Sequence, residues 1–336
     1  KMMFSLFLIL SSSRLSCKTY NNKNVDWFAA IKVPKIKDRI STHESGLGYF
    51  YRDASSKFIE GPGDLNQNSD NPLYYTLSPM YSGVSDIGYI LVSDQPPNGK
   101  SVSATRAHQK GVMIFDKDNG IYLEHSVPRF PPDPATTKTY SFPDSGVTYG
   151  QSFLCLTLEH SDLDKVLKTY LVNFPYVYSQ NIPSYASSKM PTITKLLNQE
   201  WNKKDMTIVS DVKAGRTEFK LYGKHRKWGL DLYHDLLAPS IKADIFAESW
   251  PNGVGTMNSD CSGSYRAYNV LHLSFSSIDW KRTKDHSKWG VASTTVCIGG
   301  INRQESQKTR GGGAFCVKDT SLSLEMKGFI DQYEKC

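Results

Sequence analysis

The stretch that decides the fold is His108-Gln109-Lys110-Gly111-Val112-Met113-Ile114-Phe115, because a shorter version of it recurs as His286-Ser287-Lys288-Trp289-Gly290-Val291. Each stretch places a titratable imidazole two residues before a positive charge and then continues as an apolar run typical of a buried strand. In a strand, residues i and i+2 point to the same face, so one such pair could hold a phosphate. Two facing pairs could cleave a phosphate ester.

Further polar residues follow the two motifs at nearly equal spacing. His125 comes 17 residues after His108, and Asn302 comes 16 residues after His286. We expect both to bind phosphate or to support the motif histidines, although a buried, purely structural role is the alternative for each. A third copy, His225-Arg226-Lys227, has no such partner, and we interpret it as a solvated basic patch that could touch a DNA backbone.

The length, the charge and the N-terminus limit which class of protein this can be. The 336 residues suffice for one large domain or two ordinary ones, and the net charge of +7 suits an acidic partner such as DNA. A mildly basic secreted protein without such a partner fits that charge equally well. Residues 1–16 resemble a secretory signal peptide, with a positive start, a short apolar run and small residues. No apolar run is long enough to span a bilayer, so no membrane partner is expected.

The six cysteines are Cys17, Cys155, Cys261, Cys297, Cys316 and Cys336. An even number behind a signal peptide predicts disulfides, for which six cysteines allow 15 pairings. Zinc binding is the rival interpretation, but no Cys-x-x-Cys or close Cys/His cluster occurs, and no metal site is expected.

The pattern along the chain predicts an α+β protein with two halves, residues 17–160 and 161–336, each contributing one motif. Strands and turns dominate the first half, and helical spacing is more frequent over residues 161–250. The expected helices are Asp162–Tyr170, Thr192–Trp201, Lys227–Leu237 and Leu322–Tyr333. The expected strands are Asp26–Pro34, Ile87–Val92, Gly111–Asp116, Ile121–His125, Ala267–Phe275, His286–Val291 and Thr295–Ile298. We interpret Arg310-Gly311-Gly312-Gly313 as a loop.

The chain resembles the deoxyribonuclease II family over nearly all of residues 17–336. The resemblance is carried by Val25–Phe28, Asp94–Pro97, His108–Val112, His125–Pro128, Phe130–Pro132, Thr148–Gln151, Asp285–Trp289 and Arg310–Gly313. It implies a phospholipase D-like pseudo-dimer of two β-sheet/helix halves that share one active-site cleft. The phospholipase D superfamily carries His-x-Lys followed by Gly-Ser-x-Asn, which Gly299–Asn302 matches as a variant. The Asp that follows the superfamily's motif has only a loose match in Asp116, and none after the second motif.

The resemblance also implies an activity, a set of roles and a disulfide pattern. The activity is metal-independent, cofactor-free acid cleavage of double-stranded DNA, leaving 3′-phosphate and 5′-hydroxyl ends, in lysosomes or after secretion. His108, Lys110, His286 and Lys288 would be catalytic. The implied pairs are Cys17–Cys155, Cys261–Cys336 and Cys297–Cys316.

The chemistry of the motifs leaves several assignments open. One neutral imidazole could attack phosphorus and form a phosphohistidine, while the other protonates the leaving oxygen. We assign attack to His108 and acid/base work to His286, but the swapped assignment fits nearly as well. The basic residues Lys281, Arg282 and Lys284 could steer DNA, or form an ordinary exposed loop. Monomer and homodimer both remain open.

Two other functions compete with the nuclease. One is a secreted, inactive DNA-binding or host-interaction protein on the same scaffold, which the four intact motif residues disfavour. The other is a phosphodiesterase for lipids or small diesters, which the absence of two full phospholipase D motifs disfavours.

Overall fold

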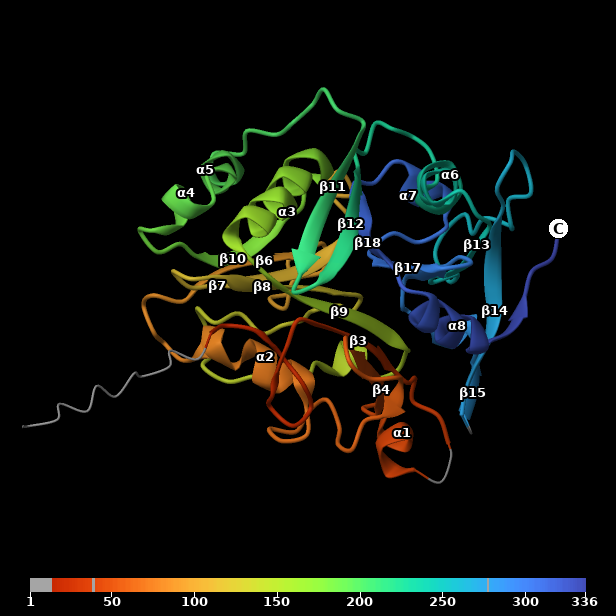
Figure 1. Ribbon diagram of the computed structural model, residues 1–336, viewed down its shortest axis with the longest axis horizontal. Coiled ribbons are helices and arrows are strands. Elements are labelled where there is room, and N and C mark those ends of the chain that lie inside the picture. The colour runs from red at the N-terminus through yellow and green to blue at the C-terminus, as the bar shows by residue number, and fades with distance from the viewer. Residues whose placement is uncertain (1–13, 38–39, 277) are drawn as a thin grey trace, which may run out of the picture.

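The computed structural model describes residues 14–37, 40–276 and 278–336. Within them the chain forms two large β-sheets with helices packed around them, so the predicted α+β class is confirmed (Figure 1). The signal peptide expected over residues 1–16 falls mainly on residues 1–13, which lie outside the described part. None of the described helices has the length and apolar character needed to cross a membrane.

The first sheet has eight strands among the described residues, in the order β10-β6-β7-β8-β9-β3-β4-β5. All neighbours in it are antiparallel. The strands are β3 (Trp27–Lys32), β4 (Tyr49–Asp53), β5 (Ile59–Glu60), β6 (Gly88–Ser93), β7 (Lys110–Phe115), β8 (Gly120–His125), β9 (Gln151–Leu158) and β10 (Val177–Asn181). Helix α2 (Pro72–Tyr81) lies on one side of this sheet, and α3 (His160–Asn173) lies on the other (Figure 1).

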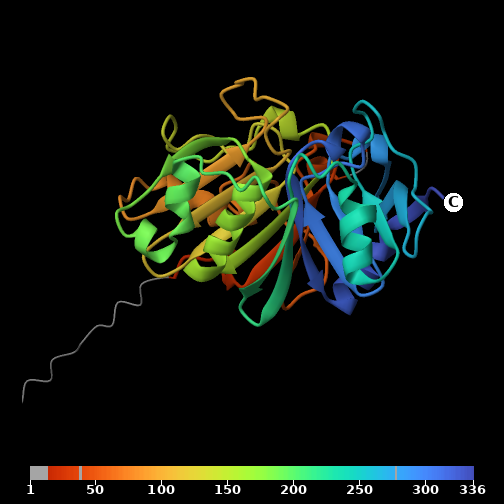
Figure 2. The same cartoon turned by 90° about the horizontal axis from the view of Figure 1, so that it is seen from above.

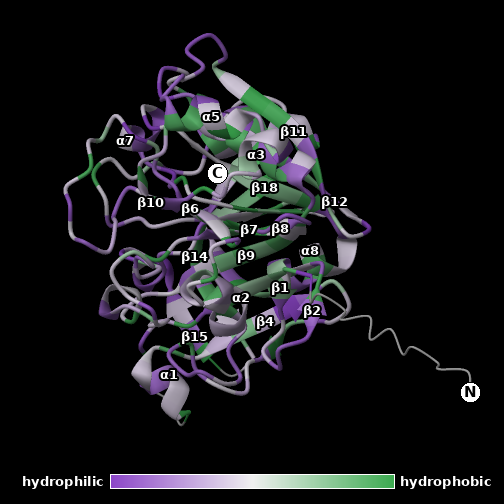
Figure 3. Ribbon diagram, turned by 90° about the vertical axis from the view of Figure 1, so that its left-hand side faces the viewer, coloured by the Kyte–Doolittle hydropathy of each residue, from purple (hydrophilic) through white to green (hydrophobic). Residues whose placement is uncertain are grey.

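Both faces of the first sheet are buried, which explains why its central strands are apolar at almost every position. In β3, Trp27, Ala29 and Ile31 face a core shared with α3, whereas Phe28 and Ala30 face a second core shared with α2. Figure 3 shows apolar colouring along the central strands, with many polar residues in the loops outside. The two-residue period of a strand therefore divides one sequence between two cores.

The second sheet follows the order β11-β12-β18-β17-β16-β13-β14-β15, with β19 added beside β14. Only the β13–β14 pair is parallel among these described strands. The strands are β11 (Thr207–Ala214), β12 (Thr217–Lys224), β13 (Ile245–Glu248), β14 (Ala267–Phe275), β15 (Ile278–Lys281), β16 (Trp289–Val291), β17 (Thr295–Gly299), β18 (Gly312–Lys318) and β19 (Ile330–Tyr333). Helix α8 (Thr320–Gly328) packs on β16 and β17.

The remaining elements are short. A separate pair of strands joins β1 (Cys17–Lys18) to β2 (Asn24–Val25). A π-helical turn over Leu232–Leu237 runs directly into α6 (Ala238–Ile241). The other short helices are α1 (Ser41–Ser45), α4 (Ala186–Lys189), α5 (Thr192–Leu197) and α7 (Glu305–Lys308).

The two sheets meet across one continuous apolar core. Strand β17 contacts β8 and β9, and β11 contacts β9, so the sheets touch directly. Helix α3 contacts strands of both sheets, β8 and β9 in the first and β11 and β12 in the second. Seen from above, the first sheet and the second lie side by side with α3 and β11–β12 at their junction (Figure 2).

Several expected elements differ in the structure. Residues 207–224 form the hairpin β11–β12 within a region expected to be more helical, and α2 occupies a stretch expected to consist mainly of strands and turns. The expected helix over Leu322–Tyr333 ends at Gly328, and Ile330–Tyr333 forms β19 instead.

The glycine-rich stretch expected as a loop contributes to a strand, because β18 begins at Gly312. Gly313 pairs with Gly223 of β12 in this sheet. A Cβ atom added at Gly313 would lie 1.9 Å from the carbonyl oxygen of Tyr222. Glycine here permits a close approach of two strands rather than a turn.

Three disulfides join Cys17 to Cys155, Cys261 to Cys336 and Cys297 to Cys316. These are the three pairs that the family resemblance implies. The first ties β1 to β9 in the first sheet region, and the third joins residues paired across β17 and β18.

Candidate functional site

The first motif lies at the start of a central strand. Lys110 is the first residue of β7, and His108 immediately precedes that strand. Both side chains are buried. The backbone N–H of His108 donates to the carbonyl oxygen of Gly311 at 2.8 Å. Because Gly311 directly precedes β18, the first motif is anchored to the second sheet by its own main chain.

The second motif is anchored in the reverse direction, to the first sheet. His286 and Lys288 precede β16, and the N–H of His286 donates to the carbonyl oxygen of Gly150 at 2.8 Å. The N–H of Lys288 donates to the hydroxyl of Ser152 at 3.1 Å. Gly150 and Ser152 flank the first residue of β9, so the second motif is fixed to the first sheet.

The ring of each motif histidine is also held by a carbonyl oxygen from the other sheet. Nδ1 of His108 lies 2.5 Å from the carbonyl oxygen of Gly300, which follows β17. Nδ1 of His286 lies 2.9 Å from the carbonyl oxygen of Ser126, which follows β8. A carbonyl oxygen only accepts hydrogen bonds, so each Nδ1 must carry the proton. In the neutral ring the lone pair is then on Nε2, which is the atom left to react.

One carboxylate organises the cations beside the first motif. Asp94 accepts from Lys110 Nζ at 2.7 Å and from Arg310 at 3.2 Å, and its Oδ2 lies 3.8 Å from Nε2 of His108. Burial alone would raise the pKa of Asp94, but the charges of Lys110, His108 and Arg310 together hold that pKa well below its usual value. Asp94 is therefore an anion in the folded protein.

Burial favours the neutral form of both motif histidines. Burial lowers the pKa of His108 to about 3, with Lys110, Lys288 and Arg310 adding to the effect and Asp94 opposing it. Burial, followed by the charges of Lys288, Lys110 and His108, holds the pKa of His286 well below its usual value. Burial and then Lys110 also hold the pKa of Lys288 well below that of a free lysine. These mutual shifts place the two motifs within electrostatic reach of each other.

Lys288 also touches its own motif histidine. Its Nζ lies 3.1 Å from Nδ1 of His286 and donates to the carbonyl oxygen of the same residue. Since Nδ1 already donates to Ser126, the close ammonium can only disfavour a positive charge on the ring. An anion beside Lys288 and His286 would reverse that effect.

His125 and Asn302 lie in buried surroundings. Neither ring nitrogen of His125 has a hydrogen-bond partner within the described residues, and the ring packs against Phe130 at 5.3 Å and Phe153 at 6.4 Å between centroids. Burial and then the charge of Lys110 hold the pKa of His125 well below its usual value. The side-chain oxygen of Asn302 likewise lacks a partner among the described atoms. Both groups thus have unused hydrogen-bonding capacity, His125 within the field of Lys110 and Asn302 two residues after Gly300.

The basic residues before the second motif form a surface turn. Arg282–Lys284 is a single 3-10 turn, with Lys281 and Lys284 exposed. The carbonyl oxygen of Lys284 accepts from the N–H of Gly150 at 2.8 Å. This places the charged turn at the outer edge of the site, two residues before His286.

Three buried carboxyls lie close to the motifs and have raised pKa values. Burial raises the pKa of Glu124 to about 8, although a hydrogen bond from Tyr122 at 2.7 Å works against it. Burial also raises the pKa of Asp285, and raises that of Glu248 well above its usual value. Burial thus favours the neutral form of all three carboxyls.

Sequence reasoning missed the groups that orient the motifs. Asp94 and Arg310 belong to stretches that carried the family resemblance, but nothing local indicated that they would meet. Ser126 and Gly300 act through their carbonyl oxygens, which no side-chain pattern can reveal. Across the described ranges, no cluster of three or more His, Cys, Asp or Glu side chains could hold a metal ion.

Comparison with known proteins covers almost the whole chain. The family model described as Deoxyribonuclease II matches residues 16–336. The chain is 35% identical to plancitoxin-1 of Acanthaster planci, over 98% of this chain and 94% of that protein. It is 32% identical to deoxyribonuclease-2-alpha of Rattus norvegicus, over 100% of this chain and 98% of that protein. It is also 32% identical to cell-death-related nuclease 7 of Caenorhabditis elegans, over 100% of this chain and 92% of that protein.

Proposed function

The chain belongs to the deoxyribonuclease II family, and on that premise we propose that it is a metal-independent acid endonuclease. Its substrate is double-stranded DNA, and its products carry 3′-phosphate and 5′-hydroxyl ends. The observation that carries the proposal is the crossed anchoring of His108 and His286, each held at Nδ1 by a carbonyl of the opposite sheet. This leaves two Nε2 atoms available for one phosphate.

The two halves act as a pseudo-dimer with one shared cleft. Each half supplies one His-x-Lys motif and one carbonyl that orients the other half's histidine. Neither half contains a complete site. The scissile phosphate sits between the motifs, where the charges of Lys110 and Lys288 already influence both rings.

In the first step Nε2 of His108 attacks phosphorus. The bond from phosphorus to the 5′-oxygen breaks, and that oxygen takes the proton from Nε2 of protonated His286. A phosphohistidine carrying the 3′ end of the cut strand results, and the 5′-hydroxyl fragment can leave. The same geometry also fits attack by His286 with His108 as the acid. An experiment is therefore needed to decide between the two assignments.

In the second step a water molecule attacks the phosphohistidine. Nε2 of His286 takes a proton from that water, the nitrogen–phosphorus bond breaks, and His108 recovers its lone pair. The product is a 3′-phosphate. Lys110 and Lys288 stabilise the negative charge that builds on the non-bridging oxygens in both steps. His125 and Asn302, with unused hydrogen-bonding capacity, support the bound phosphate.

The preference for acid follows from the burial of the site. In the empty site burial and neighbouring lysines keep His286 neutral, because they hold its pKa well below the usual value. A bound phosphate supplies the negative charge that favours the protonated ring, and low pH supplies the proton. Binding of DNA and protonation of His286 therefore assist each other.

The disulfides and the family fit a protein of the secretory route. We propose a lysosomal or secreted location, where an acid optimum is useful. A monomer holds all groups that the mechanism requires, and a homodimer would offer a wider surface to DNA.

The test is a plasmid-nicking assay in excess EDTA at a pH of about 5, followed by end analysis of the products. Cleavage with 3′-phosphate ends supports the proposal. Loss of cleavage in EDTA with recovery on adding Mg²⁺ would overturn the metal-independent mechanism. DNA binding without cleavage under any condition would instead identify an inactive binding protein.

A further inference from the structure

Two adjoining hollows lie on the surface beside the first motif and share Arg106 and Trp201 in their walls. Each has a volume of about 400 Å³. We call the pair the basic groove. Its lining includes Arg106, Tyr176, Gln199, Trp201, Lys203, His225, Arg226 and Lys227. None of the described residues that line it is acidic, so the groove has a one-sided charge.

We propose that the basic groove binds the phosphate backbone of the DNA strand next to the scissile phosphate. This inference rests on the proposed nuclease function and adds a substrate-binding surface outside the two motifs. It also gives a role to His225-Arg226-Lys227, the third copy of the motif, which lines the groove instead of joining the reaction.

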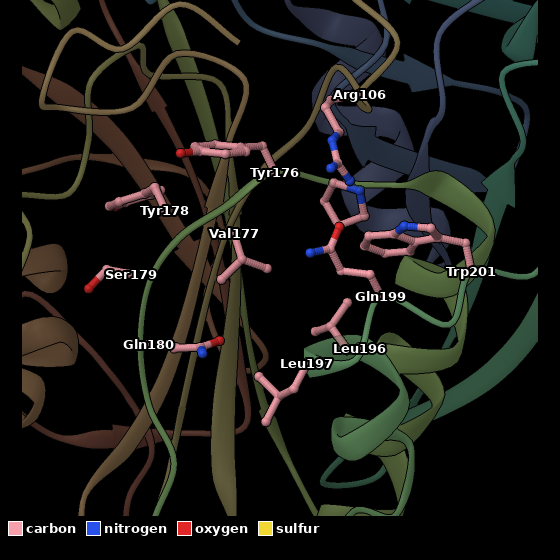
Figure 4. Close-up of a pocket in the computed structure, with 11 residues that line it drawn as sticks. Arg106, Tyr176, Val177, Tyr178, Ser179, Gln180, Leu196, Leu197, Gln199 and Trp201 are labelled. Carbon is pink, nitrogen blue, oxygen red and sulfur yellow. The ribbon is translucent and has the colours of Figure 1, made fainter. Parts of the chain in front are cut away.

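Arg106 is held in place before any ligand arrives. Its guanidinium lies 5.3 Å from the centre of the Trp201 ring, and Trp201 stacks on Phe174 at 4.9 Å. Figure 4 shows Arg106 reaching between Tyr176 and Trp201, with Gln199 beside it. A planar guanidinium fixed against an aromatic ring loses little freedom on binding and suits phosphate oxygens.

Hydrogen bonds connect the groove to the candidate site. Arg310 donates from Nε to the carbonyl oxygen of Arg106 at 2.7 Å and from its terminal nitrogen to Asp94 at 3.2 Å. Asp94 in turn holds Lys110. Arg106 is also only two residues before His108, so their Cα atoms are at most about 7 Å apart. A strand with one phosphate at His108 would therefore place a neighbouring phosphate near Arg106.

The outer wall supplies more positive charge from a different part of the chain. Lys203 and Lys227 are exposed, and Arg226 is half-buried. His225 packs edge-on against Phe174 at 5.1 Å, which joins this wall to the Trp201 stack. Rows of Lys and Arg that neutralise phosphates make binding strong and salt-dependent without reading sequence. The groove is suited to binding a DNA backbone in this way.

The experiment removes the outer charges without touching the aromatic stack. The variant Lys203→Gln/Arg226→Gln/Lys227→Gln is compared with Lys117→Gln/Lys213→Gln, which removes exposed charges outside the groove. Both sets are placed in a His286→Ala background, and Kd for a duplex of about three helical turns is measured against salt. Arg106→Gln is a second, independent variant.

If the groove holds the strand, the triple variant should raise Kd about tenfold or more at moderate salt. The slope of log K against log salt should become shallower by about 0.9 for each phosphate that the variant no longer neutralises. In the cleaving enzyme the decrease in kcat/KM should be much larger on long duplex than on a dinucleoside phosphate, which cannot reach the groove. Arg106→Gln should act in the same direction.

A triple variant with the salt slope and Kd of the control would overturn the groove proposal. That result is distinguishable from failure of the proposed function, because the otherwise unaltered enzyme would still cut DNA in EDTA. If the unaltered enzyme does not cut DNA at all, the proposed function fails, whatever the groove variants bind.

Discussion

Nδ1 of His108 and the carbonyl oxygen of Gly300 are 2.5 Å apart although 192 residues separate them in the chain. His286 and Ser126 repeat this relationship in the opposite direction at 2.9 Å. Each ring therefore has the correct tautomer and direction only when both sheets are assembled. Assembly of the two sheets is thus a condition for a working site.

The first prediction concerns the two motif histidines. His108→Ala and His286→Ala should each lower kcat for DNA cleavage by roughly 10³ or more, because each removes one of two groups needed in the same step. His272→Ala is the control, since that ring pairs with Asp279 and Asp331 and belongs to neither motif. Rates and circular dichroism should be measured together. Near-normal cleavage by a folded His108→Ala or His286→Ala protein would contradict the mechanism.

The two histidine roles can be separated by trapping. Rapid acid quenching of the enzyme with labelled DNA should capture a phosphorylated histidine, and peptide mapping identifies it. We expect the label on His108. A label on His286 would exchange the two roles while preserving the mechanism, and a complete absence of labelled protein during turnover would speak against a covalent intermediate.

The second prediction concerns Asp94, whose charge raises the pKa of His108. Asp94→Asn should therefore lower that pKa further and shift the acid limb of the kcat/KM profile to lower pH. It also leaves Lys110 and Arg310 without their buried partner, which should cost about 3 kcal/mol of unfolding free energy. Asp118→Asn, an exposed change at the β7–β8 turn, is the control. An unchanged pH profile would show that Asp94 does not act on His108.

The third prediction concerns stability against pH. Glu124 has a folded pKa of about 8, above its usual value of 4.5. Its contribution to stability is thus fully present below a pH of about 4.5 and is lost as pH rises through 8. In the Glu124→Gln variant the free energy of unfolding should fall less between these pH values, by an amount on the order of a few kcal/mol. Urea unfolding of both proteins between pH 5 and 8 measures it, and parallel curves for the two proteins would refute the assignment.

The fourth prediction concerns Lys224, a buried lysine that holds the main chain next to Arg310. Nζ of Lys224 donates to the carbonyl oxygens of Gln307, Lys308 and Arg310 at 2.7 to 3.0 Å. Lys224→Met should destabilise the protein by roughly 2–4 kcal/mol, because buried carbonyls lose their donor. It should also reduce activity, since Arg310 and Asp94 lose support. Lys220→Met, exposed on the same strand, should do neither.

The fifth prediction separates charge at the reaction centre from charge around it. Lys288→Ala should lower kcat strongly, because its charge acts on the developing anion. Lys281→Gln/Lys284→Gln should mainly weaken DNA binding and make its salt dependence shallower. Binding is measured in the His286→Ala background to prevent cleavage. An unaltered salt slope in the double variant would mean that this turn does not meet DNA.

The sequence predicted the strands that carry the motifs because their signal is local. The apolar run after Lys110 corresponds to β7, and the shorter run after Lys288 corresponds to β16. The hairpin β11–β12 was not predicted, although Val212 and Ala214 are buried between exposed neighbours in a strand pattern. The alternation is interrupted at Val209, an apolar side chain that is exposed.

The orienting groups of the site could not be predicted from the sequence. Ser126 and Gly300 contribute main-chain oxygens, so their side chains carry no signal. Asp94 and Arg310 pair across 216 residues. Such contacts depend on how two sheets pack, and no periodicity within either sheet encodes that packing.

The distribution of the disulfides has a consequence for the lifetime of the protein among proteases. Cys17–Cys155 lies before the segment 182–206, and the other two bridges lie after it, so no covalent cross-link spans that segment. A cut there would produce two chains joined only by packing and hydrogen bonds. Each chain would carry one of the two motif histidines, and the carbonyl that orients it would belong to the other chain. After such a cut only the shared apolar core would hold the two chains together, so conditions that disrupt that core would switch the enzyme off with every disulfide still intact.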